Sequence, residues 1–103
     1  MTLQVINAKY LGDYRIEVEF TGNITRVVDL SCELDGEIFE PLKHLDYFKT
    51  FHLECGTISW GNGADIAPEY LFLISKPLTD DTKPSAIEID ILLSVQKLYG
   101  LAS

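Results

Sequence analysis

The chain has 103 residues, of which 47% are hydrophobic, and 16 acidic against 8 basic residues give it a net charge of -8. A chain of this length fits one domain, residues 1–103, with a single core, and its hydrophobic content excludes a disordered polymer. The cations are scattered along the sequence, so the acidic balance disfavours direct binding to nucleic acid or to an acidic membrane surface.

The N-terminus and the cysteines indicate the compartment. The start Met1-Thr2-Leu3 lacks the basic-then-apolar order of a signal peptide, and no apolar run approaches the roughly 20 residues needed to cross a bilayer. Cys32 and Cys55 are too far apart in sequence to form a C-x-x-C pair. We therefore expect a cytoplasmic protein with reduced thiols and no membrane partner.

The first third of the chain is predicted to form an antiparallel β-meander, with strands at residues 3–10, 14–20 and 24–30. A three-residue second loop would place Arg15 opposite Asp29 and Val18 opposite Arg26. Arg26 then falls on the apolar face of the sheet. Because a lone buried guanidinium is costly, Arg26 must lie at the edge of that face or pair with a carboxylate from elsewhere in the chain.

The middle of the chain changes its period. Between residues 31 and 50 large apolar side chains recur every three residues, which predicts short helical or 3₁₀ turns laid over the sheet. Residues 51–54 and 57–60 are predicted to form a second short hairpin around Cys55-Gly56. The fold class expected is therefore α+β, with a meander and a second hairpin packed against short helices.

Residues 60–69, which include the only Trp, predict a strand end, a tight turn and the start of a helix at residues 68–75. Asp65 or Ala67 would lie near the helix N-cap, and Asp65 has the better capping chemistry. If helical, Asp65 and Glu69 would share a face, an arrangement that serves acid/base chemistry or cation binding. A cap and a helix-dipole partner are the stronger interpretation of this pair.

The C-terminal part is predicted as an exposed connector at residues 76–84, followed by an amphipathic helix over residues 86–99. Ser85 and Glu88 match a capping box, so this unit spans residues 85–100, and Gly100 suits the C-terminal end.

This last helix carries apolar residues on two sides. At 100° per residue, Ile89 and Leu93 form a stripe apart from the broad apolar face that includes Ile87, Ile91, Leu92, Val95, Leu98 and Tyr99. Either the helix lies in a groove of its own domain, or Ile89 and Leu93 contact a second chain.

Motifs for known chemistry are weak or missing. His44, His52, Cys55 and Cys32 could supply metal ligands, but their spacing does not match a zinc site, and no metal is predicted. Neither Cys has a local signature of activation, and the Gly61-Asn62-Gly63 turn is too short for a nucleotide fingerprint. We therefore predict no catalytic residue and no cofactor.

Several stretches resemble a known family. They are Val27-Val28-Asp29-Leu30, Gly36-Glu37-Ile38-Phe39-Glu40-Pro41-Leu42, Tyr47-Phe48, Gly56-Thr57-Ile58-Ser59-Trp60 and the W-x-N-G-A-D-x-x-P-E run from Trp60 to Glu69. Together they make residues 3–75 similar to the prokaryotic domain-of-unknown-function family 2442, although many members have Pro where this chain has Gly61.

The resemblance implies a compact α+β fold, with no established activity and no assigned catalytic residues. Some relatives resemble one half of two-gene toxin–antitoxin-like modules or carry an attached DNA-binding helix-turn-helix, neither of which is visible in this chain. Residues 76–103 fall outside the similar region.

Two functional hypotheses follow. The first is a protein-interaction or regulatory module that binds another protein or itself, with Ile89 and Leu93 as interface candidates. The alternative is a small-ligand-binding or enzymatic site around Trp60. Its candidate residues are Asn62, Asp65 and Glu69, with Arg26 as an anion clamp.

Overall fold

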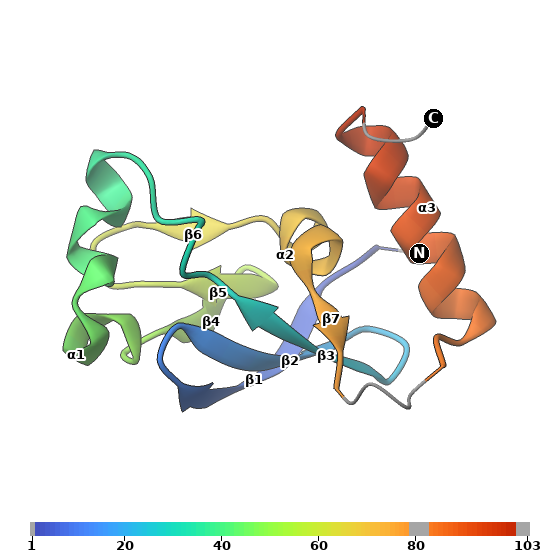
Figure 1. Ribbon diagram of the computed structural model, residues 1–103, viewed down its shortest axis with the longest axis horizontal. Helices are drawn as coiled ribbons and strands as arrows, with labels where there is room; N and C mark the ends of the chain where they lie inside the picture. Colours follow the sequence, from blue (N-terminus) through green and yellow to red (C-terminus); the bar gives the residue numbers. More distant parts are fainter. Residues whose placement is uncertain (1, 79–82, 101–103) are drawn as a thin grey trace.

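Two antiparallel sheets and a set of short helices form the molecule in this computed structural model, which describes residues 2–78 and 83–100 (Figure 1). The α+β prediction is confirmed. The molecule measures 36 × 27 × 23 Å, and its C-terminal helix lies at one end of the longest axis, which is horizontal in Figure 1.

The larger sheet has the strand order β1-β2-β3-β7, and it begins with the predicted meander. Its first strands are β1 (Val5–Gly12), β2 (Arg15–Phe20) and β3 (Ile24–Asp29). Phe20 pairs with Ile24, Val18 with Arg26 and Arg15 with Asp29, so the predicted register is confirmed. The three-residue loop fixes which residues of β2 and β3 lie opposite each other. A slip by one residue would turn the buried side chains of a strand toward solvent, so the alternation of each strand favours the same register.

The fourth strand of this sheet was not predicted. β7 (Lys76–Pro77) pairs with β3 through Arg26 and Val27, at positions that we expected to be an exposed connector. Both β7 residues remain exposed, and Pro77 fits an edge strand because it has no N–H to donate to a further neighbour. Part of the expected connector, residues 79–82, lies outside the described residues.

The second sheet contains β4 (His52–Glu54), β5 (Thr57–Ser59) and β6 (Asp65–Ile66). The predicted hairpin of β4 and β5 is confirmed. Its turn residues Cys55 and Gly56 adopt φ of 52° and 76°, the left-handed pair that a two-residue hairpin requires.

Asp65 is a correction to the sequence interpretation. It lies in β6 opposite Ser59, whereas the N-cap of the following helix is Ala67, which makes no side-chain capping bond. The Trp60 N–H donates to the Ala64 carbonyl at 2.8 Å and closes the turn as a hairpin. The chain therefore stays extended past Asp65 before the helix begins.

Short helices pack around the sheets. The 3₁₀ helix η1 (Glu37–Lys43) and α1 (Leu45–Phe48) form the predicted helical turns at one end of the molecule, on the left of Figure 1. The predicted helix after Pro68 is α2 (Pro68–Ile74), and the C-terminal helix is α3 (Ala86–Leu98). Figure 1 shows α2 between the sheets and α3.

The core lies on the inner face of the meander. Fully buried side chains there include Ile16, Val18, Phe20 and Val28, and the same core contains the buried rings of Phe48, Trp60 and Phe72. The rings of Phe20 and Phe72 meet edge to face at 4.9 Å between centroids, and this contact joins β2 to α2.

α3 begins with the predicted capping box. The Glu88 N–H donates to Ser85 Oγ at 3.2 Å, and the Ser85 N–H donates to Glu88 Oε1 at 3.3 Å. Gly100 adopts a φ of 70° just after the C-cap residue Tyr99, as expected for the end of a helix.

Candidate functional site

Arg26 holds three elements together inside the protein. Its side chain is 6% exposed, and Nη1 donates to Glu88 Oε2 of α3 at 2.9 Å. Nε donates to Ser75 Oγ at 2.5 Å, and Nη2 donates to the Ser75 carbonyl at 3.1 Å. Ser75 is the C-cap residue of α2. The guanidinium also lies 5.1 Å from the centre of the Phe72 ring.

Of the two alternatives that the sequence left for Arg26, the structure has the paired one, and the carboxylate is that of Glu88. Since each guanidinium nitrogen already donates to a protein oxygen, Arg26 is not available as an anion clamp for a ligand. Its role in the structure is to fasten α3 to β3.

Trp60 and Asn62 also have structural roles. Trp60 is 1% exposed, and its Nε1–H donates to the Phe48 carbonyl at 2.8 Å. The Asn62 amide donates to the Ile38 carbonyl at 2.8 Å and accepts from the Ala64 N–H at 3.1 Å. The bonds to Ile38 and Phe48 join the turn after β5 to η1 and α1. Because the Trp60 side chain is buried, its ring cannot line a surface site.

Asp65 and Glu69 do not share a helix face. Asp65 lies on β6, and Glu69 lies in the first turn of α2, where its charge complements the helix dipole. They open onto two different grooves. The structure therefore does not assemble Arg26, Trp60, Asp65 and Glu69 into one ligand site.

The N-terminal groove, of about 460 Å³, lies between the N-terminal segment, α2 and α3. Its principal lining residues are Leu3, Glu69, Asp90, Ile91, Val95 and Leu98. The tyrosine groove, of about 410 Å³, contains three carboxylates and three aromatic rings, from Glu33, Asp35, Asp65, Phe39, Tyr70 and Tyr99. No single motif indicated either groove, because the lining residues come from segments far apart in the sequence.

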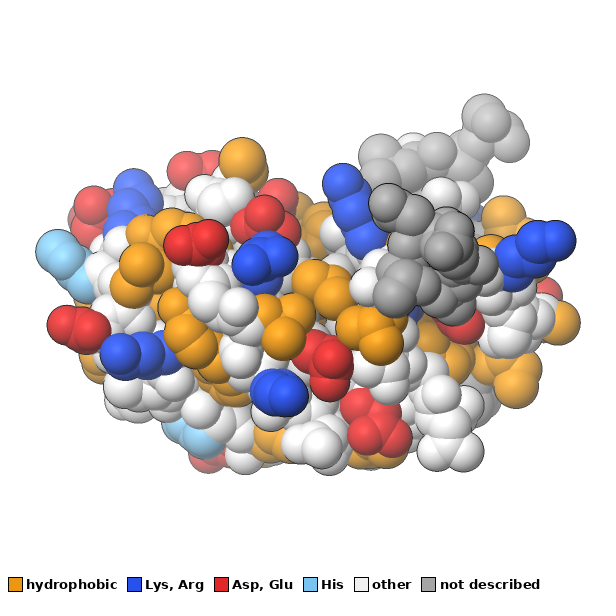
Figure 2. Space-filling view, turned by 60° about the horizontal axis from the view of Figure 1, so that its bottom comes forward, with side chains coloured by type: hydrophobic (Ala, Val, Ile, Leu, Met, Phe, Trp, Pro, Cys, Tyr) orange, Lys and Arg blue, Asp and Glu red, His pale blue; other side chains and the backbone are white. Residues whose placement is uncertain are grey.

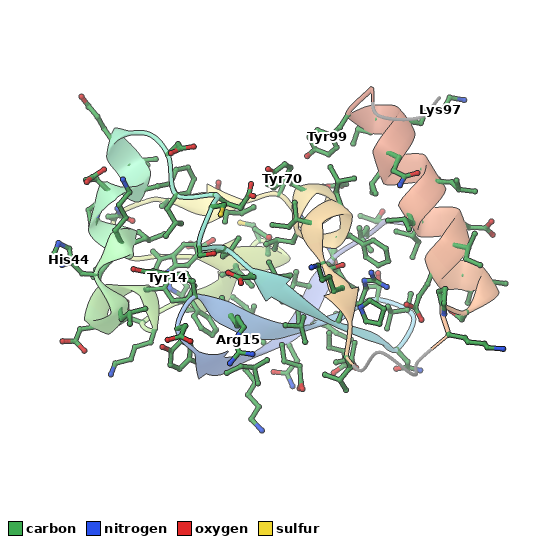
Figure 3. The ribbon with its side chains drawn as sticks, in the orientation of Figure 1. Tyr14, Arg15, His44, Tyr70, Lys97 and Tyr99 are labelled. Carbon is green, nitrogen blue, oxygen red and sulfur yellow. The ribbon has the colours of Figure 1, made fainter. Side chains whose placement is uncertain are left out.

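Two tyrosines join α2 to the end of α3. The Tyr70 and Tyr99 rings meet edge to face at 5.5 Å between centroids, and Figure 3 shows the pair between the two helices. The Tyr70 hydroxyl donates a hydrogen bond to Glu33 Oε1. This bond to a carboxylate, together with burial and the nearby negative charge, raises the pKa of Tyr70 to about 12.

We expect one of the five tyrosines to ionise near pH 12 in an ultraviolet absorbance titration, later than an ordinary tyrosine. Glu33→Gln should bring this step down toward about 10, since the amide carries no charge. The folded pKa is raised, so the bond stabilises the fold below about pH 10 and this contribution is lost as the pH rises toward 12. A late step that persists in Tyr70→Phe would contradict the assignment.

α3 is anchored on one side and exposed on the other. Ile91 and Val95 are buried against the domain, whereas Ile89 and Leu93 are 45% and 57% exposed. The helix therefore docks on its own domain and still presents the predicted stripe to solvent. The broad apolar face is covered only in its centre: Leu98 is 66% exposed, because α3 packs mainly on the seven-residue α2.

Exposed apolar side chains are concentrated at this end. Of ten exposed large hydrophobic residues in the described part of the chain, five belong to α3 and its C-cap: Ile87, Ile89, Leu93, Leu98 and Tyr99. Figure 2 shows hydrophobic side chains over much of one face, including the right-hand end where α3 lies, with acidic and basic side chains interspersed among them.

The candidate metal ligands are dispersed. His44 lies exposed at the end opposite α3 (Figure 3), and the exposed His52 contacts Glu54 at 3.3 Å. Cys32 and Cys55 are exposed and free. Within residues 2–78 and 83–100, no three His, Cys, Asp or Glu side chains are placed to hold a metal ion. None of the helices in these residues has the length and apolarity to span a membrane.

Comparison with known proteins identifies the family. The model of DUF2442, a family of proteins of unknown function, matches residues 5–77, which is more than half of the chain. The chain belongs to this family, so the family predicted from the sequence is confirmed. No curated protein and no solved structure matches the chain. The matched region contains both sheets and α2, whereas α3 lies beyond it.

Proposed function

We propose that this protein is an interaction module with a regulatory role, and that α3 carries its binding surface. The observation that supports this proposal best is the stripe of Ile89 and Leu93, which are 45% and 57% exposed. Contiguous exposed apolar side chains frequently mark interaction sites. The stripe lies on a helix whose opposite side is buried against the domain through Ile91 and Val95.

The anchoring of α3 makes it suitable as a binding platform. A free helix of 13 residues would be marginal in water, but this one has a capping box and buries Ile91 and Val95. The buried ion pair of Arg26 and Glu88 fixes its first turn against β3. A partner would therefore meet a preformed surface and would not have to order the helix on binding.

The proposed partner is a different protein with an apolar patch bordered by basic side chains. A second copy of this chain would bring another net charge of -8 to the contact, which electrostatic repulsion disfavours. The family resemblance adds a two-gene toxin–antitoxin-like pair as the proposed context, with the prokaryotic cytoplasm as the compartment. Self-association is the competing outcome of the experiment.

The double variant Ile89→Ser and Leu93→Ser should lose the partner while the chain stays folded, because both side chains are more than two-fifths exposed. We expect affinity to fall at least about tenfold, as for the loss of central apolar contacts. The measurement is affinity purification of the tagged full chain from its native cells, with stoichiometry, followed by titration of the recovered protein against the purified variants.

The matched control is Ile6→Ser with Leu53→Ser, which removes two apolar side chains of similar exposure, 47% and 41%, outside α3. Equal partner binding by the wild type and the α3 variant would overturn the proposal, and so would recovery of the chain alone. Deletion of α3 is a poorer test. It removes Glu88 and would leave Arg26 buried without its carboxylate, so misfolding could be mistaken for lost binding.

A further inference from the structure

The N-terminal groove runs along the side of α3 that the Ile89–Leu93 stripe does not occupy. Thr2 and Leu3 form one wall, Glu69 of α2 another, and α3 the third, and Figure 1 shows the N-terminal end of the chain beside α3. Its volume of about 460 Å³ falls in the range of roughly 300–1,000 Å³ typical of binding pockets. It has room for a few side chains of a partner segment.

The floor of this groove is apolar and its charged groups are acidic. Leu3, Ile91, Val95 and Leu98 supply aliphatic surface, and Thr2 and Ser94 supply hydroxyl groups. Glu69 and Asp90 supply the charges, and none of the lining residues is Lys, Arg or His. Such a lining matches a segment with aliphatic side chains and one or two cations.

The carboxylates of Glu69 and Asp90 form no ion pair with a basic side chain of the described residues. Across residues 2–78 and 83–100 the ion pairs are Arg26 with Glu88, Lys43 with Glu40, Lys49 with Asp46 and His52 with Glu54, so neither groove carboxylate takes part in one. The net charge of -8 adds to the negative potential at this site. A second copy of the chain would place more negative charge here, whereas a basic segment would be attracted.

We propose that the N-terminal groove binds a basic amphipathic segment of the partner protein. A Lys or Arg of that segment pairs with Glu69 and Asp90, and its aliphatic side chains pack on Leu3, Val95 and Leu98. This inference rests on the proposed interaction function. It adds to that function the chemistry of one partner segment, which would contact α3 on the side opposite Ile89 and Leu93.

The probe is a fluorescein-labelled helix-forming peptide of leucine, alanine and lysine, titrated against the full chain by polarisation. Two matched peptides have lysine replaced by glutamate, or leucine replaced by serine. We expect only the parent peptide to bind, with affinity falling as salt rises. In ¹⁵N-labelled chain it should shift amide signals of Leu3, Glu69 and Asp90 to Leu98.

Glu69→Gln with Asp90→Asn should weaken peptide binding about tenfold. The control is Glu37→Gln with Asp46→Asn, which makes the same two chemical changes on η1 and α1 at the other end of the molecule. Equal weakening by the control would show attraction by net charge alone and overturn the inference. Binding of the glutamate peptide, or amide shifts outside the groove, would also overturn it.

Binding of the natural partner by the two double variants tests the groove assignment separately from the proposed interaction function. If that partner is lost by the Ile89→Ser and Leu93→Ser variant but retained in full by the Glu69→Gln and Asp90→Asn variant, the interaction module stands and the groove assignment fails. Loss of the partner in both variants supports both assignments. Loss in the groove variant alone supports the groove and removes the stripe from the interface.

Discussion

Replacing Glu88 with alanine is expected to lower the free energy of unfolding by about 3–5 kcal/mol, because the change leaves the Arg26 guanidinium buried without its carboxylate. Loss of the Glu88 half of the capping box adds to this effect. α3 should loosen first, since only Ile91 and Val95 are otherwise buried on it. The measurements are urea unfolding followed by Trp60 fluorescence and hydrogen exchange of the α3 amides.

Three variants test the physical cause. Glu88→Gln keeps the length and an acceptor oxygen, so it should lose less stability than alanine. Arg26→Met with Glu88→Leu replaces the pair by apolar groups and should recover most of the loss. Glu40→Ala breaks the Lys43 pair, whose side chains are half or more exposed, and should cost less than about 1 kcal/mol. An alanine variant of Glu88 as stable as that of Glu40 would contradict the anchoring role.

Trp60→Ala is expected to lower the free energy of unfolding by about 3–5 kcal/mol, since it removes the largest fully buried side chain and leaves a cavity beside Phe48. A domain of this size has a total stability of roughly 5–15 kcal/mol, so this single change removes a large part of it. Thermal unfolding followed by far-ultraviolet circular dichroism measures the loss without relying on tryptophan fluorescence.

Trp60→Phe should be milder than alanine. It keeps aromatic packing on Phe48 but leaves the Phe48 carbonyl without its indole donor, at a cost of about 1–3 kcal/mol. Leu53→Ala, at a side chain 41% exposed, provides the surface comparison. If Trp60→Ala unfolds within about 1 kcal/mol of the wild type, then Trp60 is not the structural anchor that its burial indicates.

Local patterns predicted much of the fold. Period-two alternation and a three-residue loop are enough to set the β2–β3 register, and Ser85 with Glu88 is enough to start α3, since each depends on neighbours in the chain. Asp65 shows where local chemistry was not sufficient. A carboxylate before Pro68 is compatible with a helix cap and with a strand. The hydrogen bond from the Trp60 N–H to the Ala64 carbonyl closes a hairpin, which places Asp65 in a strand opposite Ser59.

The candidate sites were less predictable than the elements that carry them. Glu69 and Tyr70 are adjacent in sequence, yet one opens onto the N-terminal groove and the other onto the tyrosine groove. Successive residues of a helix point in different directions. α3 lines the N-terminal groove, and its C-cap residue Tyr99 lines the tyrosine groove. Neither groove could be drawn before the position of α3 was known.

The sequence by itself determined the α+β class, the meander and its register, the two-sided apolar character of α3, and the requirement that Arg26 lie at the edge of the apolar face or pair with a carboxylate. Hydrophobic period, turn length and the cost of a lone buried charge all act without reference to distant residues. Only the tertiary structure decided that the anion is Glu88, that Trp60 is structural, and that Ile89 and Leu93 remain exposed. The first and third outcomes depend on how α3 docks, and the second on how α1 packs against the turn after β5, because packing brings together residues far apart in the chain.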